Sequence, residues 1–393
     1  MRILIQHRNH YGYPAPAALG PHLIRLRPAT HAKARIESYS LRVTPECALR
    51  WQQDPFGNHV ARITFAAGVR VPALDLLVEL AADIHPVNPF DFFVDDRCEE
   101  MPFQYPEELR LDLRPFLDLE DAAVRGGPRL AALLADLPAR GRTVPLVVAL
   151  NEAVNRRIRY VIREEPGIWT PEETLAASRG SCRDSAVLLM AALRSRGLAA
   201  RFVSGYLVQL ADEGMIPDAP KGVGQDVVDL HAWAEVFLPG AGWIGLDATS
   251  GLLCGEGHIP VACTATPALA APIEGTSDTA AREVSFQMTV TRLGHEPRPT
   301  TPYEEGVWQE LLAAGDRADA TLAGAGIRLT VGGEPTFNSR DHAAEPEWNV
   351  AAVGPTKWTL GVRLVEELRR RLTPGAAVLL RMGKHYPGES LPR

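Results

Sequence analysis

The chain has 393 residues, of which 46% are hydrophobic and 23% charged, and its formal net charge is −7. These values are close to globular averages, so they exclude a mainly disordered, collagen-like or coiled-coil chain. The negative net charge and the lack of a basic tract argue against nucleic acid as a partner, because phosphate binding relies on clustered Lys and Arg. At about 100–200 residues a domain, the length allows two to four domains.

Five cysteines are present, an odd and sparse count that does not fit a disulfide scaffold: Cys47, Cys98, Cys182, Cys254 and Cys263. We therefore expect a reducing compartment. The apolar run at the N-terminus is too short for a signal peptide, and no stretch approaches the roughly 18 consecutive apolar residues of a membrane helix. The sequence predicts a soluble cytoplasmic protein without membrane contact.

Residues 1–115 have a β pattern. Polar and apolar residues alternate over 38–44 and 59–65, turn residues at 54–58 separate these segments, and 78–84 is suited to a buried strand. Short strands at regular spacing predict a small antiparallel β domain, either a sandwich or an open sheet.

Helical periodicity begins near residue 116. One helix face is indicated at the i, i+3, i+4 and i+7 spacing by Leu130, Leu133, Leu134 and Leu137. Two more helices are predicted over 144–157 and 181–196, and strands come next over 200–208, 231–238 and 243–247. This order of helices and then strands indicates an α+β domain over 116–275.

The last part of the chain is more mixed. Residues 264–281 are rich in Ala, Pro, Thr and Ser and predict a linker. Residues 284–293 predict one amphipathic strand, which pairs either with the N-terminal β domain or with the C-terminal part of the chain. Helices are predicted over 302–314 and 357–372, and we assign 283–393 to a partial α/β C-terminal segment.

The segment 180–185 (GSCRDS) carries the most informative local pattern. Ser181 has the position of an N-cap, and Asp184 comes three residues later as in a capping box. Cys182 then begins the helix, where the positive end of the helix dipole stabilises a thiolate. The alternative is a small buried cysteine with no chemical role, which is the commoner case for an isolated cysteine.

His231 and Asp247 are the candidate partners of this thiol. His231 begins a predicted strand, and Asp247 ends the next one, where its carboxylate can orient an imidazole in a nucleophile, base and orienter arrangement. Alternatively, His231 is a structural imidazole and Asp247 caps the turn before Thr249. Because side chains alternate along a strand, the two share a face of a hairpin only if opposing residue numbers have an even sum. We therefore expect a loop with an odd number of residues, or a bulge.

The chain resembles the bacterial transglutaminase-like superfamily in four ordered segments: 180–184 (GSCRD), 197–206 (GLAARFVSGY), 229–236 (DLHAWAEV) and 242–250 (GWIGLDATS). It also resembles the β domain that precedes this core in long bacterial members, in residues 19–28, 51–55 and 88–93. The resemblance implies a papain-like fold for the core. One departure is Ala248, where the family usually has proline, and we expect it to loosen a turn without abolishing chemistry.

The resemblance implies a cysteine enzyme that performs acyl transfer or hydrolysis at peptide or isopeptide amide bonds. It assigns Cys182 as the nucleophile, His231 as the base and Asp247 as the orienter. The substrate would be a peptide or protein, and no cofactor is implied. The alternative function is a non-catalytic interaction scaffold for a domain further along the chain.

The remaining site residues are expected around these three. The backbone N–H of the nucleophile is one donor to the oxyanion, and the second is either Tyr160 or Trp169, with neither preferred. Arg183 is expected to help hold the thiolate. Structural or pocket-wall roles are expected for Trp233 and Glu235.

Downstream segments resemble the start of an uncharacterised domain that is fused to this core in long bacterial proteins and is related to carboxylate–amine ligases: 329–337 (LTVGGEPTF), 347–349 (EWN) and 386–393 (YPGESLPR). The resemblance implies that this chain covers only the beginning of that domain. We accordingly expect contact with the remainder of a longer parent chain.

One further pattern concerns metals. Cys254, His258 and Cys263 have a spacing that is plausible for zinc, but a structural zinc takes four ligands and the spacing matches no common finger. We therefore predict no metal site. The pair Gly332 and Gly333 lacks the subsequent Lys and Ser or Thr of a phosphate loop.

Overall fold

The structure is a computed structural model. It describes residues 1–163, 165, 167–211, 223–294, 305–325, 341–342, 345–349, 354–372, 374–375 and 377–378. The chain forms two compact units, Met1–Glu296 and Pro297–Arg393. All candidate site residues lie in the first unit.

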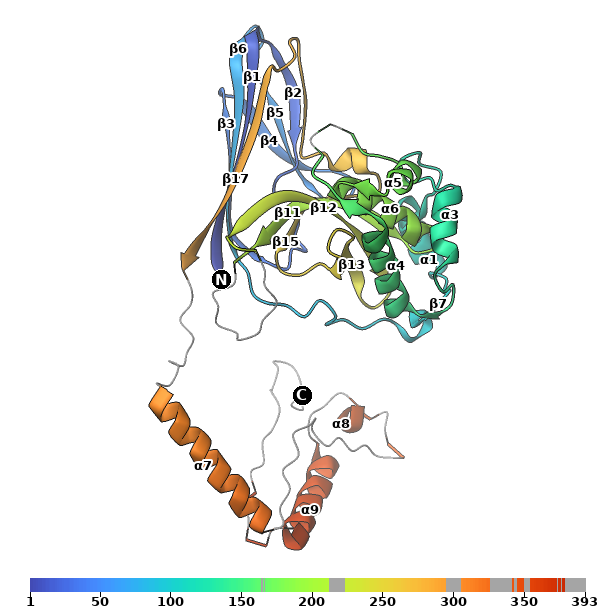
Figure 1. The fold of residues 1–393 in the computed structure, drawn as a ribbon, viewed down its shortest axis with the longest axis vertical. Helices are drawn as coiled ribbons and strands as arrows, with labels where there is room; N and C mark the ends of the chain where they lie inside the picture. The colour runs from blue at the N-terminus through green and yellow to red at the C-terminus, as the bar shows by residue number, and fades with distance from the viewer. Residues whose placement is uncertain are drawn as a thin grey trace. The chain divides into compact units, whose positions relative to one another are not determined.

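In the described residues, the N-terminal part of this unit contains two four-stranded antiparallel sheets (Figure 1). The first has the order β17-β1-β6-β3, formed by Glu283–Gly294, Arg2–Ala17, Val71–Asp83 and Arg35–Thr44. The second has the order β16-β2-β5-β4, formed by Ile273–Ser277, Leu19–Ile24, His59–Thr64 and Ala48–Gln53. The predicted antiparallel β domain is confirmed.

Two strands of these sheets come from the far end of the unit. β17 pairs with β1 from Gly294 opposite Arg2 to Glu283 opposite Gly12, which confirms the first alternative for 284–293. The expected start of the C-terminal segment at residue 283 therefore falls inside the first unit. The predicted linker over 264–281 is wrong, because its residues form a 3-10 helix, Pro267–Ala270, and then β16, which pairs with β2. The free edge of β2 supplies hydrogen-bond partners that composition cannot reveal.

The described residues that come after the N-terminal sheets pack helices against a five-stranded sheet. Its antiparallel order is β14-β13-β12-β11-β15, formed by Leu252–Leu253, Gly242–Asp247, Val227–Leu238, Ala200–Gln209 and His258–Thr264. Helix α6 lies across β11 and β12, α4 and α5 pack on α6, and α3 packs on α5 (Figure 1). These helices are α3 (Pro128–Ala135), α4 (Thr143–Arg157), α5 (Pro171–Ala177) and α6 (Cys182–Ser195). The unit is α+β, as predicted.

Short elements connect these layers. The helical ones are a 3-10 helix at Asp96–Cys98, α1 (Glu107–Asp112) and α2 (Arg114–Leu117). The short strands are β7 (Glu100–Met101), β8 (Gly141–Arg142), β9 (Arg159–Tyr160) and β10 (Arg179–Gly180). β7 pairs with β8 antiparallel, whereas β9 and β10 pair in parallel just before α6 begins.

Helix α6 is the centre of the core. Every residue from Asp184 to Arg194 is buried. The helix is enclosed because the sheet covers one side and α4 and α5 cover others. It ends before Gly197, whose φ of 77° is the left-handed conformation that glycine adopts without a steric penalty.

β12 separates two environments. Ala232 and Ala234 pack in the cluster that contains α6, while Trp233 points to the other side, into a small cluster with Val203 and Cys263. This is the alternation expected of a strand that is buried on both faces. Small residues face the helix because its backbone then approaches the sheet closely.

The N-terminal sheets and the five-stranded sheet share one hydrophobic cluster. Ile3 of β1 and Ile63 of β5 pack together with Val208 of β11. A buried polar pair crosses the same boundary, since His7 Nδ1 lies 3.0 Å from the Tyr206 hydroxyl. Burial lowers the pKa of His7 to about 4, so the imidazole is neutral at physiological pH. The first unit is therefore a single packed body.

The described residues of the second unit form helices α7 (Glu305–Gly324), α8 (Pro346–Asn349) and α9 (Pro355–Leu372). They agree with the predicted helices at 302–314 and 357–372, although 302–304 lie outside the described residues. The segments 329–337 and 386–393 also lie outside them. Among the described helices, none combines the length and the apolar composition needed to cross a membrane.

Candidate active site

Asp184 organises the start of α6. Its Oδ2 accepts hydrogen bonds from the Ser181 N–H at 2.9 Å and the Ser181 hydroxyl at 2.8 Å, which agrees with the predicted capping box. Its Oδ1 accepts from Arg163 Nη2 and from the Trp169 N–H, both at 2.8 Å. Burial would raise the pKa of Asp184, but these hydrogen bonds outweigh it and lower the pKa. The carboxylate stays ionised and fixes the backbone around Cys182.

Cys182 is the first residue of α6, as predicted, and its side chain is half-buried. At this position, the free backbone N–H groups and the helix dipole favour negative charge on the sulfur. All five cysteines of the chain are free thiols. Cys182 is therefore the thiol that combines access from solvent with a helix N-terminus.

The hairpin between β12 and β13 brings His231 and Asp247 to one face. Leu238 lies opposite Gly242 and Ala234 opposite Leu246, so opposing numbers have an even sum and the loop 239–241 has an odd length. The prediction that a shared face needs such a register is confirmed. His231 Nε2 lies 3.2 Å from Asp247 Oδ2.

The charges of this pair support each other. Burial alone would lower the pKa of His231, but interactions with Asp247 and Cys182 outweigh it and raise the pKa to about 10. Burial would raise the pKa of Asp247, but its bonds to His231 and other donors hold it well below the usual range. Both neighbours therefore favour the imidazolium form of His231.

Asp247 also has the capping role that was the structural alternative. Its Oδ1 accepts from the Thr249 N–H at 2.8 Å and from the Thr249 hydroxyl at 2.7 Å. Oδ2 is left for His231. One oxygen of the carboxylate therefore caps the turn, and the other faces His231.

The turn after Asp247 is held without the proline that the family usually has. Asn155 of α4 donates from Nδ2 to the carbonyl of Ala248 at 3.2 Å and to that of Thr249 at 2.8 Å. The Gly251 N–H bonds the Asp247 carbonyl at 2.8 Å. A side chain from the neighbouring helix thus supports the segment where we expected Ala248 to loosen the turn.

His258 is a neighbour of the site to which sequence reasoning assigned no role. Its Nε2 lies 3.4 Å from Asp247 Oδ2, and its ring meets that of Trp233 edge to face at 5.2 Å. Cys254 and Cys263 pack with Val203 and Trp233, and the contact of His258 with Asp247 was not among the expectations from the sequence. Only the order β12-β11-β15 in the sheet brings His258 here, and no local pattern reports it.

Two of the other candidates lie beside the triad. Tyr160 in β9 is 47% exposed and pairs with Gly180, two residues before Cys182. Burial raises the pKa of its hydroxyl, and the charges of neighbouring groups add to this. Trp233 is almost fully buried behind His231, with their rings stacked at 6.4 Å between centroids.

Trp169 and Arg183 have other contacts. The Trp169 ring lies under the Arg163 guanidinium, 4.8 Å from its carbon to the ring centroid. Arg183 Nη2 donates to the carbonyls of Arg163 at 2.9 Å and of Glu165 at 3.2 Å. These contacts tie the segment before α5 to the start of α6. Arg163, which holds Asp184 as well, was missed because it carries no motif of its own.

Glu235 has a structural partner, as expected. Arg201 Nη2 lies 2.6 Å from Glu235 Oε2, and both side chains are largely buried. Burial would raise the pKa of Glu235, but Arg201 and His31 lower it to about 2. Glu235 is therefore a buried carboxylate held ionised by a guanidinium.

Three protein-family models match the chain. Residues 3–80 match "Bacterial transglutaminase-like N-terminal region", and residues 138–248 match "Transglutaminase-like superfamily". Residues 278–393 match "Putative amidoligase enzyme (DUF2126)". The second range contains all three residues of the triad.

Similar proteins are known by sequence and by structure. Uncharacterised proteins of Mycobacterium tuberculosis and Mycobacterium bovis are 29% identical over 281 residues, covering 66% of this chain and 82% of each relative. A crystal structure described as "a Putative Cysteine Protease from Cytophaga hutchinsonii" aligns with a TM-score of 0.54 at 18% identity. It covers 78% of this chain and 95% of that one, and at this identity the likeness concerns the fold.

Proposed function

We propose that this chain, which carries a bacterial transglutaminase-like N-terminal region, a transglutaminase-like core and a DUF2126 segment, is a cysteine enzyme acting on amide bonds. Its substrates would be peptides or proteins, including isopeptides. The observation that carries the proposal is the arrangement of Cys182, His231 and Asp247, with a thiol at a helix N-terminus and an imidazole held by a buried carboxylate.

In the first half-reaction, the Cys182 thiolate attacks the amide carbonyl carbon and forms a C–S bond. His231, as the imidazolium, gives its proton to the leaving nitrogen, and the C–N bond breaks to release the amine. In the second half-reaction, water or an acceptor amine attacks the thioester while neutral His231 takes its proton. The C–S bond breaks and the thiolate is regenerated.

Asp247 would hold the imidazole during both steps. Its Oδ2 faces His231 and its Oδ1 is anchored to Thr249, so the carboxylate cannot turn away from the ring. This is the orienting role of the third member of such a triad, which keeps the imidazole in place and stabilises its positive form.

The tetrahedral oxyanion needs donors aimed at it. The Cys182 N–H is available because the first N–H groups of a helix have no partner within it. We propose the Tyr160 hydroxyl as the second donor, since Tyr160 is half exposed and its backbone pairs with Gly180, two residues before Cys182. Trp169, the other candidate, gives its backbone N–H to Asp184 and its ring to Arg163.

The first test is the rate of iodoacetamide labelling at Cys182 as a function of pH, measured by mass spectrometry of the labelled peptides. Cys47 is an internal control, because it is also half-buried and burial raises its pKa. At pH 6 we expect Cys182 to react faster than Cys47 by on the order of tenfold or more, since only the thiolate is nucleophilic. In His231→Ala this advantage should disappear.

Equal pH profiles for the two thiols, unaffected by His231→Ala, would instead support a non-catalytic scaffold. The reaction itself is tested by incubating the full chain and Cys182→Ala with a peptide library and a labelled amine. Products that are shortened indicate hydrolysis, and products that carry the label indicate transamidation. Both must be absent with Cys182→Ala, or the proposed nucleophile is wrong.

A further inference from the structure

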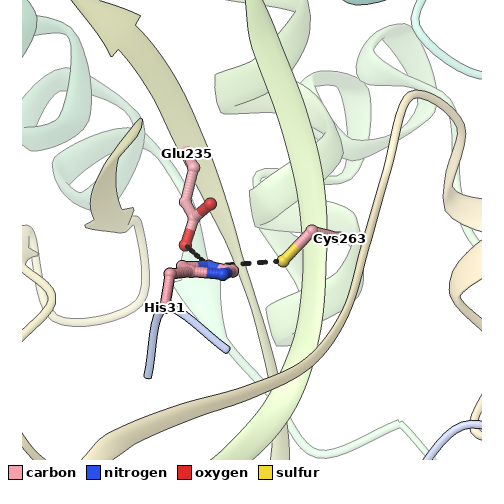
Figure 2. Close-up of side chains that lie close together, drawn as sticks. All are labelled: His31, Glu235 and Cys263. Carbon is pink, nitrogen blue, oxygen red and sulfur yellow. Dashed lines mark hydrogen bonds and ion pairs between the residues drawn. The ribbon is translucent and has the colours of Figure 1, made fainter. Parts of the chain in front are cut away.

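Apart from the triad, three potential metal ligands converge on the face of β12 that carries His231. His31 comes after β2 in the chain, Glu235 lies in β12 and Cys263 in β15. Figure 2 shows the His31 imidazole between the Glu235 carboxylate and the Cys263 sulfur. Glu235 and His231 are four residues apart on one strand, so the two groups of side chains are about 13 Å apart along it.

The distances in this group fit the edges of a metal coordination sphere. His31 Nε2 lies 3.5 Å from Glu235 Oε1 and 3.7 Å from Cys263 Sγ. For tetrahedral zinc, the usual bond lengths give edges of about 3.3 Å between nitrogen and oxygen and about 3.5 Å between nitrogen and sulfur. All three ligand atoms lie within 4.8 Å of one another, so small side-chain rotations would complete the geometry.

We propose that His31, Glu235 and Cys263 bind a zinc ion or a similar divalent transition-metal ion. Imidazole and thiolate are the ligands that such borderline-soft ions prefer, and a carboxylate completes many of their sites. Glu235 and Cys263 are buried at 5% and 2% exposure, while the His31 side chain is 41% exposed. The exposed imidazole provides the entry path and leaves the fourth position open to solvent.

The positive charge of Arg201 is the feature of this group that disfavours a bound cation. Its Nε and Nη2 lie 2.7 Å and 2.6 Å from Glu235 Oε2, so the guanidinium occupies one oxygen and leaves Oε1 facing His31. Hydrogen bonds to the second oxygen of a ligating carboxylate are a usual support for metal ligands. Arg201 Nη2 also lies 3.2 Å from His31 Nε2, and the ion would replace that contact.

The chemistry of the ligands determines which proton is released when the ion binds. The ion binds the Cys263 sulfur as a thiolate, so the S–H proton passes to solvent and no electrons are transferred. With two negative ligands, Arg201 and a divalent ion, the occupied site carries one net positive charge. Affinity should therefore rise with pH, because each bound ion releases a proton.

The test uses all 393 residues in a Cys182→Ala background, which removes the proposed catalytic thiol. Cobalt(II) is the spectroscopic probe, because a cobalt–thiolate bond gives a charge-transfer absorption in the near ultraviolet. Zinc binding is measured by equilibrium dialysis. We expect one ion per chain with the cobalt–thiolate band, loss of that band in Cys263→Ser, and a fall in zinc affinity of about tenfold or more in His31→Ala.

His85→Ala is the matched control, since His85 is also an exposed histidine and lies away from the cluster beside Asp83. A second group of side chains could also hold a cation: His231, Asp247 and His258. The His258→Ala variant shows whether the bound ion lies in that group. Because Cys263 is buried, the Cys263→Ser variant can fail to fold. In that case the zinc affinity of the His31→Ala variant, which changes an exposed side chain, decides whether the proposal holds. A folded chain without the cobalt–thiolate band, or zinc binding lost in His258→Ala but kept in His31→Ala, would overturn the proposal.

Discussion

Asp247 uses its two carboxylate oxygens for different purposes. Oδ1 binds the backbone and hydroxyl of Thr249, and Oδ2 faces His231 at 3.2 Å and His258 at 3.4 Å. Because the Thr249 contacts fix the carboxylate, the position of the His231 ring depends on a residue that is itself immobilised. Side chains that are themselves held by neighbours in this way keep their partners in a defined geometry.

His231 should make the stability of the fold depend on pH. Its pKa is raised from 6.5 to about 10 in the folded chain, so its charged form stabilises the fold fully below pH 6.5. This contribution is lost as pH rises from 6.5 through 10. In urea unfolding we expect the free-energy gap between the full chain and His231→Gln to shrink over that range. A gap that stays constant or widens would show that the imidazole is not held charged.

Asp184 should be essential for the start of α6. In Asp184→Ala the buried Arg163 guanidinium loses its carboxylate partner, which costs about 3–5 kcal/mol for a buried pair. The Trp169 and Ser181 hydrogen bonds are lost as well, so labelling of Cys182 should slow. Urea unfolding and iodoacetamide kinetics measure the two effects.

The control for Asp184→Ala is Glu152→Ala, which removes the partner of Arg156 in an exposed pair of α4. Such a pair is worth about 0–1 kcal/mol, and the variant should label at the original rate. Equal losses of stability in the two variants would contradict the central role of Asp184.

At the scale of elements, β15 lies beside β11 and supplies one residue to each of two groups of side chains on this sheet. His258 joins His231 and Asp247, and Cys263 joins His31 and Glu235. The pairing of β11 and β15 shifts its register between Ser204 and Gly205. A Cβ at Gly205 would lie 2.3 Å from the Ile259 carbonyl oxygen and 2.5 Å from Trp233 Cη2. Glycine is therefore required for the close approach of β15 and of the ring behind His231.

Gly205→Ala should accordingly destabilise the chain by about 1–3 kcal/mol or more, because the backbone of β15 and the Trp233 ring must both move. Displacement of Trp233 should also disturb His231 and slow Cys182 labelling. Gly255→Ala is the control, since nothing lies within 4 Å of a Cβ there. If Gly205→Ala matches that control in thermal unfolding and labelling, the close approach is not a constraint.

At the scale of the whole molecule, the boundary of the first unit lies after β17. β17 covers the edge of β1, and its Met288 and Val290 pack against the cluster shared by all three large sheets of the described residues. The DUF2126 match begins at residue 278, whereas the first unit ends at residue 296, so the matched range begins inside the first unit. A strand from the matched region completes the sheet of the N-terminal region.

A chain cut after residue 296 should keep the urea midpoint and the Cys182 labelling of the first unit. A chain cut after residue 282 should have a lower midpoint, because it exposes the edge of β1 and the cluster under Met288 and Val290. Circular dichroism during urea titration measures both. Equal midpoints for the two truncated chains would mean that β17 does not stabilise the unit.

Much of the local structure is encoded in short-range pattern. The limits of α6, the capping box at Ser181 and the shared face of His231 and Asp247 depend on residues within one helix turn or one hairpin. Such features are set by spacing and alternation, which a single sequence displays directly. The cytoplasmic location also rests on sequence reasoning and stays a prediction.

The contacts that complete the two sites depend instead on the tertiary fold. Arg163 reaches Asp184 across 21 positions, and His31 reaches Cys263 across 232 positions. The pairing of β17 with β1 joins the two ends of the first unit. No periodicity links residues so far apart, because their proximity results from sheet order and packing of the whole unit. Local pattern singled out the thiol, the imidazole and the carboxylate as candidates, and the family resemblance gave them roles, whereas long-range packing determines which side chains surround them.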